Sequence, residues 1–189
     1  KSIIISNGLV SRIFRITPNL ATIDYVNQMT SESMLRAVSS EGEITINGER
    51  WYLGGLDGQP ERGYFKSEWI EEMTTKKNSF IVEDLEVLES IQTLKWARSR
   101  WALNKELPTG KSLVFTLRGA DELKDVKVKL YYDIYDHLPI IRKHMEIFNS
   151  SDEPINLDSF KLEYLAFAEP ESPVEEQDPK EFITPNIHI

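Results

Sequence analysis

The chain has 189 residues, of which 40% are hydrophobic and 28% are charged. This composition is ordinary for one folded domain and too apolar for a disordered chain. The net charge of -9 at pH 7 argues against phosphate-backbone binding, which depends on clustered Lys and Arg, so nucleic acid is not an expected partner.

Short strands separated by turns are expected in the first third of the chain. Apolar residues recur between clusters of turn-forming residues over 9–16, 20–26, 34–38, 43–46 and 49–53. Asn47-Gly48 predicts a tight hairpin between the last two strands, because a type I′ turn needs positive φ at both central residues. Residues 54–60 hold three glycines and one proline and predict a surface loop. Their spacing matches neither of the common glycine-rich phosphate motifs.

One short helix is expected, from Ser67 to Thr75. Phe65, Trp69 and Met73 are spaced four residues apart, which places them on one face of a helix. Ser67 is a candidate N-cap at the start of this segment.

Longer strands are expected in the rest of the chain. They are predicted over 80–88, 90–103, 112–118, 126–135, 140–149, 154–157 and 159–167. The clearest is 126–135, where apolar and polar residues alternate, so one face is expected to be buried and the other wet. Pro139 interrupts the pattern and predicts a bend into the next strand.

The strand that follows Pro139 has two distinct faces. Ile141, Met145 and Ile147 share one face. The opposite face holds Arg142, His144 and Glu146. We therefore expect the first three side chains to pack on a core.

Together the elements predict an all-β fold, an antiparallel β-sandwich of about a dozen strands with one short helix, over residues 1–167. Residues 168–182 hold three prolines and six acidic residues, which predicts an acidic, proline-rich loop or linker. The apolar segment 183–189 predicts the start of a further strand, so we expect the natural chain to continue.

Other features narrow the environment of the chain. It has no cysteine, which excludes disulfides and thiolate metal sites. No window approaches the ~18 consecutive apolar residues of a membrane-spanning helix, and no membrane partner is expected. The chain begins with Lys1 rather than Met, which indicates a processed or truncated N-terminus. These features fit a cytoplasmic protein or an exported one that has lost its signal peptide.

Carboxylates and histidines are candidates for hydrolase or epimerase chemistry. Asp133 and Asp136 are the best local pair for glycoside hydrolysis, which needs two carboxyl groups roughly 5 to 9.5 Å apart. Three residues of separation put them on opposite faces of a regular strand, which favours solvated carboxylates. His137, His144 and His188 show no metal-ligand spacing, and no serine lies in a nucleophile elbow. The sequence therefore predicts no catalytic residue, no metal site and no cofactor.

Aromatic residues are the main candidates for ligand binding, because flat rings pack against the faces of sugars. Core packing is the alternative role for each of the four tryptophans. On a regular strand Trp96 and Trp101 face opposite sides, and Arg98 and Arg100 share the side of Trp96. The candidate carbohydrate-binding residues are Trp96, Arg98, Arg100, Trp101, Tyr64 and Phe65.

Four stretches of the sequence carry a family resemblance. They are residues 7–38, which begin NGLVSRIFRITPNLATIDYV, residues 52–64 (YLGGLDGQPERGY), residues 131–157, which begin YYDIYDHLPIIRKHMEIFN, and residues 184–189 (TPNIHI). They resemble the N-terminal domain of α-galactosidase-like glycoside hydrolases of the family 36 and melibiase type. The resemblance implies a β-supersandwich of the galactose-mutarotase-like class that precedes a (β/α)₈ catalytic barrel. It also implies that the catalytic aspartates lie in that barrel, outside this chain.

These observations predict a non-catalytic N-terminal β-sandwich module of a larger α-galactosidase-like glycoside hydrolase. Such a module packs on the catalytic barrel of the same natural chain and contributes to oligosaccharide binding. One alternative is a stand-alone carbohydrate-binding module. The other is an aldose epimerase-like enzyme or hydrolase built on Asp133, Asp136, His137 and His144. A sizeable exposed apolar patch would favour the first hypothesis, whereas dispersed histidines and carboxylates would count against the enzyme.

Overall fold

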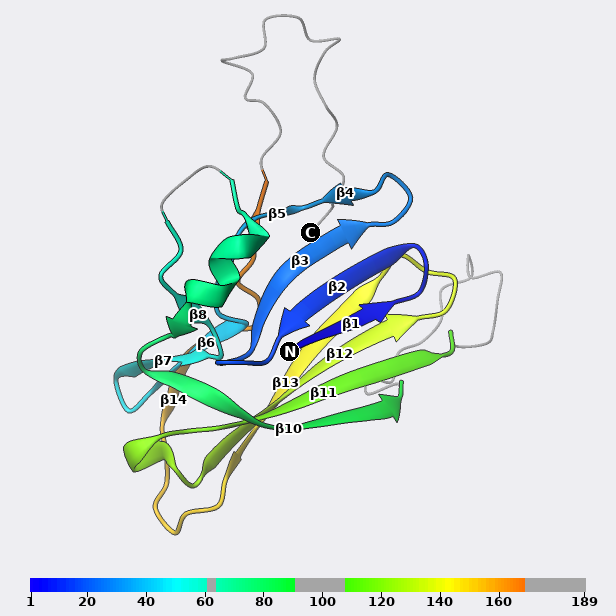
Figure 1. The fold of residues 1–189 in the computed structure, drawn as a ribbon. Coiled ribbons are helices and arrows are strands. Elements are labelled where there is room, and N and C mark those ends of the chain that lie inside the picture. The colour runs from blue at the N-terminus through cyan, green and yellow to red at the C-terminus, as the bar shows by residue number, and fades with distance from the viewer. Residues whose placement is uncertain (61–63, 91–107, 169–189) are drawn as a thin grey trace, which may run out of the picture.

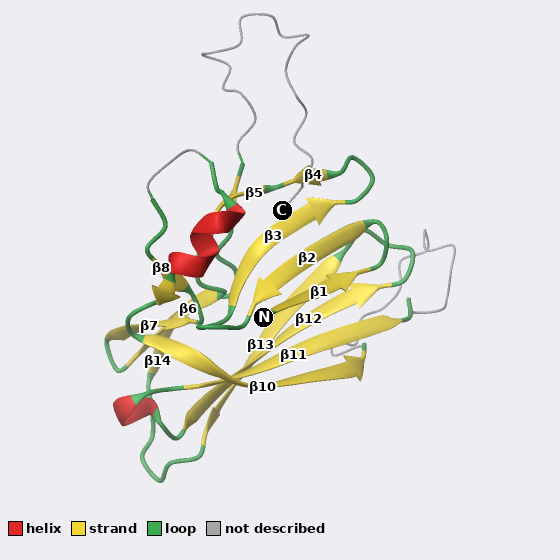
Figure 2. Cartoon of the chain, viewed as in Figure 1, coloured by secondary structure: helices red, strands yellow, loops and turns green. Residues whose placement is uncertain are grey.

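The computed structural model describes residues 1–60, 64–90 and 108–168. Of the described residues, 56% lie in strands and 6% in helices, so this part of the chain is all-β. A four-stranded sheet packs face to face with a seven-stranded sheet, as the ribbon views in Figures 1 and 2 show. Among the described residues, no helix is long and apolar enough to cross a membrane.

The four-stranded sheet is antiparallel, with strand order β1-β2-β3-β4. Its strands are β1 (Ser2–Ser6), β2 (Val10–Arg15), β3 (Ala21–Asn27) and β4 (Glu32–Ser33). The sequence analysis missed β1 and β4. β1 forms because its isoleucines alternate: Ile3 and Ile5 pack on the core, while Ile4 is exposed.

The seven-stranded sheet has the order β13-β12-β11-β10-β7-β6-β14. Its strands are β6 (Gly42–Ile46), β7 (Glu49–Leu53), β10 (Ser79–Glu89), β11 (Gly110–Arg118), β12 (Val126–Tyr135), β13 (Ile141–Asn149) and β14 (Leu157–Lys161). All pairs are antiparallel except β7 with β10, which run parallel over a short contact at Ser79 and Phe80. Two small pairs flank the sheets, β5 (Leu35–Ala37) with β15 (Ala166–Phe167) and β8 (Leu56–Asp57) with β9 (Thr74–Thr75).

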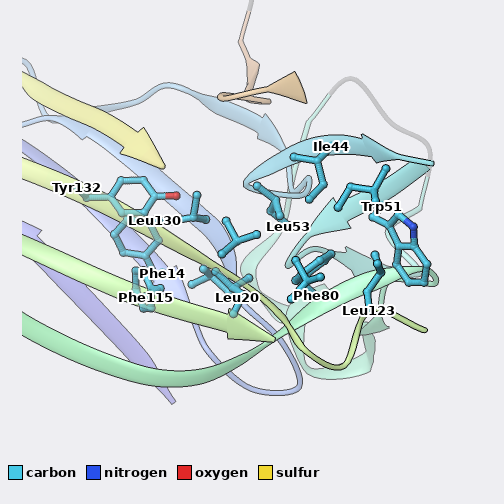
Figure 3. Close-up of a cluster of buried hydrophobic side chains, with 14 of the residues drawn as sticks. Phe14, Leu20, Ile44, Trp51, Leu53, Phe80, Phe115, Leu123, Leu130 and Tyr132 are labelled. Atoms are coloured by element: carbon cyan, nitrogen blue, oxygen red, sulfur yellow. The ribbon is translucent and has the colours of Figure 1, made fainter. Parts of the chain in front are cut away.

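The core lies between the two sheets. Phe14 of β2 meets Phe115 of β11 and Tyr132 of β12 edge to face, with ring centroids 5.1 Å and 4.7 Å away. A second part of the same core holds Trp51 and Phe80, which also pack edge to face (Figure 3). Full burial of one such side chain contributes about 1.5 to 3 kcal/mol, so this layer is the main source of stability.

Several predicted elements are confirmed. β12 and the hairpin at Asn47-Gly48 have the expected positions, and φ is 51° at Asn47 and 82° at Gly48. On β13, Ile141, Met145 and Ile147 pack on the core as expected. The strand predicted over 90–103, the linker over 168–182 and the strand over 183–189 lie almost entirely outside the described residues.

The expected helix is shorter and tighter than predicted. It is a 3₁₀ helix, η1 (Ser67–Glu72), preceded by Lys66 as N-cap with no side-chain capping bond, so Ser67 is not the cap. Met73 is extended and leads into β9. Met73 packs with Leu56 in a small second core, and this packing determines where the helix ends. The described residues hold a second 3₁₀ turn, η2 (Asp121–Leu123).

The glycine-rich segment is a surface loop only in its second half, where Gly58 and Pro60 are exposed. Gly54, Gly55 and Leu56 are buried. The amide of Gly55 donates to the carbonyl of Leu20 at 2.6 Å, and a Cβ atom at Gly54 would lie 2.3 Å from the same carbonyl oxygen. Glycine is needed at position 54 because Leu20, just before β3, leaves no room for a side chain.

The predicted strands over 154–157 and 159–167 are also wrong in their boundaries. The structure has β14 (Leu157–Lys161), a break, and the short β15. A bulge at Asp158 shifts the register, so Leu157 lies opposite Ile46 and Phe160 lies opposite Ile44. The bulge thus turns Leu157 and Phe160 toward the same side of the sheet as these two core residues.

Candidate functional site

A group of polar side chains lies inside the sandwich and is here named the Glu41 cluster. Its members are Arg12 on β2, Thr22 on β3, Glu41 before β6, Tyr132 on β12, Lys143 on β13 and Glu163 after β14. Arg12 points inward because it shares a strand face with Phe14. Lys143 does so because it lies directly opposite Tyr132 in the β12–β13 register.

Glu41 is the acceptor at the centre of this cluster. Its Oε2 accepts from Arg12 Nη2 at 2.7 Å and from the Tyr132 hydroxyl. Its Oε1 accepts from the Thr22 hydroxyl at 2.8 Å and from the Thr22 amide. Lys143 Nζ donates to the backbone carbonyl of Glu41 and to Glu163 Oε1, the latter at 2.9 Å. The carboxylate is therefore fully hydrogen-bonded although only 1% of Glu41 is exposed.

The Glu41 cluster holds two cationic and two carboxylate side chains, so its formal charges cancel. Their burial and mutual interactions shift the pKa values of its members. Burial alone would raise the pKa of Glu41, but Arg12, Lys143 and the hydroxyl donors together lower it to about 2. Burial opposes the charge of Arg12, yet Glu41, Tyr132 and Glu163 raise its pKa above the ordinary value. Burial lowers the pKa of Lys143 despite the two glutamates. Burial and Glu41 raise the pKa of Tyr132 well above the ordinary value.

This arrangement fits a structural role better than a chemical one. Arg12 and Tyr132 are 2% and 0% exposed, so no substrate reaches them without opening the sandwich. The guanidinium also lies over the Tyr132 ring, 4.7 Å from its centroid. The cluster connects the four-stranded sheet to the seven-stranded sheet by charge-assisted hydrogen bonds. The sequence analysis did not identify it, although Lys143 interrupts the apolar face of Ile141 and Met145.

A second polar group lies on the opposite, outward face of β11, β12 and β13. Ser112, Asp133 and Arg142 are register partners across these three strands. Arg142 donates through Nε at 2.7 Å to Asp133 Oδ2, and its Nη2 lies 2.6 Å from the same oxygen. Asp133 is 1% exposed, so the expectation that this face of β12 is wholly wet is wrong at this residue. The buried carboxylate is stable there because the guanidinium neutralises it.

His144 is the neighbour of this ion pair. Its ring stacks on Tyr131 at 4.2 Å between centroids, and its Nδ1 lies 3.7 Å from Asp133 Oδ2. Burial lowers the pKa of His144; Asp133 opposes this shift and Arg142 adds to it. Burial and the hydrogen bond to Glu146 raise the pKa of Tyr131 to about 12. His144 is therefore a neutral ring at pH 7.

The outward group does not form a nucleophilic triad. Ser112 Oγ is buried without a hydrogen-bond partner among the described residues, but Ser112 and His144 lie on strands separated by β12. Two strand spacings are roughly 10 Å, beyond the ~3 Å reach of a general base. Asp133 contacts both neighbouring strands and lies between the two residues.

Only part of the predicted enzyme constellation comes together. Asp133 and His144 are neighbours, as described above. Asp136 is exposed and accepts from the Thr109 hydroxyl at 2.6 Å, and His137 is exposed in the turn with φ of 62°. Asp133 and Asp136 therefore do not share a site, and His188 lies outside the described residues. Within the described ranges, no three His, Asp or Glu residues are grouped to hold a metal ion.

The candidate carbohydrate-binding residues divide into three groups. Trp96, Arg98, Arg100 and Trp101 lie outside the described residues. Phe65 is half-buried and packs against the second core with Met73. Tyr64 is 51% exposed, and its ring lies 5.7 Å from that of Trp69.

The described residues include two tryptophans, Trp51 and Trp69, which differ in burial. Trp51 is 6% exposed and packs in the main core, so it is not a surface ligand contact. Trp69 is half-buried on η1 beneath the exposed Tyr64.

Comparisons with known proteins add no relative to this description. No family model, no curated protein and no solved structure matches the chain.

Proposed function

We propose that this chain is a non-catalytic β-sandwich module of a larger α-galactosidase-like glycoside hydrolase, and that it packs on the catalytic barrel of the same natural chain. The proposal extends the sequence resemblance, and the two-sheet all-β architecture is compatible with it. The observation that carries it is an uncovered apolar strip at the edge of the seven-stranded sheet.

The strip consists of Leu157 and Phe160 on β14. The bulge at Asp158 directs both side chains to the face of Ile44 and Ile46, which are 0% and 1% exposed. Leu157 and Phe160 are nevertheless 44% and 59% exposed, so the core face continues past the part that the four-stranded sheet covers. A face of this kind is typical of a surface that another domain covers.

The proposal is tested in the product of the complete reading frame. We expect a barrel-sized domain after residue 189 and hydrolysis of p-nitrophenyl α-galactoside by the full-length protein. Leu157→Ser combined with Phe160→Ser should lower the melting temperature and activity of that protein, because two apolar contacts of about 1.5 to 3 kcal/mol each are removed. In the isolated chain, the same double variant should lower the free energy of unfolding by less than about 1 kcal/mol.

Met29→Ser is the matched control, because Met29 is 63% exposed far from β14 in sequence and should affect neither protein. A reading frame without a second domain overturns the proposal. So does a double variant that behaves like the control in the full-length protein.

Carbohydrate binding is the second candidate function, and Tyr64 is the observation that favours it. Its exposed ring lies beside Trp69, which provides a flat aromatic contact with a fluorescent reporter next to it. An α-galactoside oligosaccharide should quench Trp69 fluorescence, and Tyr64→Ala should remove the saturable change. Tyr164→Ala, at a tyrosine that is 48% exposed elsewhere, should leave it intact. An unchanged titration curve in Tyr64→Ala would exclude this site.

A further inference from the structure

The free edge of β1 is the least protected strand edge in the described part of the chain. β1 is the outermost strand of the four-stranded sheet, and no described residue pairs with its outer side. Its sequence, Ser-Ile-Ile-Ile-Ser, contains no charge, no proline and no bulge. Soluble proteins usually block open edges with such features, because unpaired backbone groups recruit another strand.

The other open edges of the two sheets are protected, including that of β10 beyond Phe80, which carries Glu83, Asp84 and Glu86. β4 has only two residues. β13 carries charged side chains at Arg142, Lys143 and Glu146. β14 carries Asp158, Lys161 and a bulge. The contrast indicates that the edge of β1 is adapted for pairing.

Two backbone hydrogen bonds show which residues of β1 face β2. Ile16 donates to the carbonyl of Lys1 at 3.1 Å, and Asn7 donates to the carbonyl of Val10 at 3.4 Å. Both pairs fit the β1–β2 register, and bonded pairs alternate along an antiparallel ladder. The odd-numbered residues of β1 therefore bond to β2.

The even-numbered residues, Ser2, Ile4 and Ser6, direct their amide and carbonyl groups away from β2. Their sequence is symmetric about Ile4, since β1 reads the same in both directions. An antiparallel copy of β1 placed on a twofold axis at Ile4 would lie with Ile4 opposite Ile4, and Ser2 opposite Ser6. These are bonded pairs in the ladder, so every outward backbone group of β1 finds a partner.

Apolar side chains near the edge of β1 are also exposed to solvent. Ile4 is 62% exposed, and Val87 on the facing sheet is 66% exposed. Beside them lies a cavity of about 250 Å³, lined mainly by apolar side chains of β1, β10, β11 and β12 together with Ser6 and Lys111. The sandwich is therefore open and apolar beside β1.

We propose that two copies of this chain associate through β1, which pairs antiparallel with β1 of the second copy and joins the four-stranded sheets into one continuous sheet. The twofold arrangement brings Ile4 of each copy together on the outer face. It also brings Ile3 of one copy opposite Ile5 of the other on the inner face, beside the apolar cavity. A second copy fits better than an unrelated strand, because β1 itself carries no charged side chain to select a partner and its sequence is its own complement.

Cysteine cross-linking tests the register, because the chain contains no cysteine. In Ile4→Cys the two introduced side chains face each other across a bonded pair with Cα atoms about 5.5 Å apart, within the range of a disulfide. We expect nearly complete covalent dimer under mild oxidation. Met29→Cys, at another exposed position, should give little dimer at the same protein concentration.

A mixed experiment distinguishes this pairing from a parallel one. Ser2→Cys alone should cross-link poorly, since the two copies of residue 2 are more than about 13 Å apart in the proposed register. A mixture of Ser2→Cys with Ser6→Cys should form the heterodimer. Efficient cross-linking of Ser2→Cys with itself would overturn the proposed register.

The oligomeric state is the second measurement. Sedimentation velocity of the chain should show a dimer, and Ile4→Val should retain it. Ile4→Lys should raise the dimer dissociation constant by at least tenfold, because two like charges then lie opposite each other. The circular dichroism of Ile4→Lys should be unchanged, and Met29→Lys should remain dimeric. A monomeric parent chain at 100 µM, or a dimer insensitive to Ile4→Lys, overturns the proposal. None of these results depends on the presence of a catalytic barrel.

Discussion

Individual residues matter most in this molecule where a charge is buried. Glu41 and Asp133 are each 1% exposed, and each forms an ion pair with an arginine. The alternation placed Asp133 and His144 on the outward face of their strands, but it did not predict that Asp133 is buried there. Glu41 was not identifiable from the sequence, because its environment is formed by residues from distant parts of the chain. A local pattern shows which way a side chain points but not which side chains it meets.

Removal of the Glu41 charge should strongly destabilise the fold. Glu41→Gln leaves Arg12 and Lys143 buried with only Glu163 to balance them, and we expect the free energy of unfolding to fall by about 3 to 5 kcal/mol. Urea denaturation measures the change. Glu43→Gln is the matched control, because the partners of Glu43, Arg50 and Lys161, are 62% and 54% exposed. Glu43→Gln should lower the free energy of unfolding by less than about 1 kcal/mol. An equal loss of stability in both variants would contradict the stabilising role of the Glu41 cluster.

The His144 pKa offers a test of the outward group. Arg142 lowers this pKa and also neutralises Asp133. Arg142→Gln should therefore raise the pKa of His144. The measurement is an NMR titration of the ring Cε1 proton, assigned by its absence in His144→Gln. Arg50→Gln, at an exposed arginine, should leave the curve unchanged, and a downward shift in Arg142→Gln would refute the assigned electrostatics.

The elements show which sequence signals are reliable. β12 and the hairpin at Asn47-Gly48 follow from periodicity and turn chemistry alone. The segment at Gly54 and the end of η1 do not, because close packing against Leu20 and Leu56 determines them. β1 was missed because five residues with three adjacent isoleucines show too little alternation to recognise as a strand.

Two glycines separate the effect of backbone conformation from that of close packing. Gly48 has φ of 82° and no atom within 4 Å of an added Cβ, so Gly48→Ala should cost about 1 kcal/mol. Gly54 has φ of 64° and meets the Leu20 carbonyl as well, so Gly54→Ala should cost about 2 to 4 kcal/mol. Denaturant midpoints of both variants check the order. Equal losses would mean that the backbone at Leu20 moves aside.

At the scale of the whole molecule, two sheets share one apolar core, with a charged cluster between them. The sandwich was predictable because strand content and alternation determine the fold class. The exposed apolar strip on β14 was not, because a bulge at Asp158 reverses the expected direction of one side chain. The pairing of β1 with β2 was not predictable either, and so the open outer edge of β1 was not foreseen.

Acid should act on the whole molecule through the Glu41 cluster. The folded pKa of Glu41, about 2, lies below the ordinary value of 4.5, so the folded state binds fewer protons between these two values. The stabilising contribution is complete above about pH 4.5 and is lost as the pH falls through the folded pKa. The difference in unfolding free energy between the parent chain and Glu41→Gln should therefore shrink from pH 5 to pH 2. Denaturation curves at four pH values measure it, and a constant difference would contradict the linkage.

The position of Glu163 in the sequence affects when the protein can fold during synthesis. It is bonded to Arg12, 151 positions earlier in the chain. During synthesis, Arg12 leaves the ribosome well before the Glu163 carboxylate that completes its neutralisation. The interior with balanced charge can therefore close only after β14 and Glu163 have been synthesised, so its formation waits for contacts between residues that are distant in sequence.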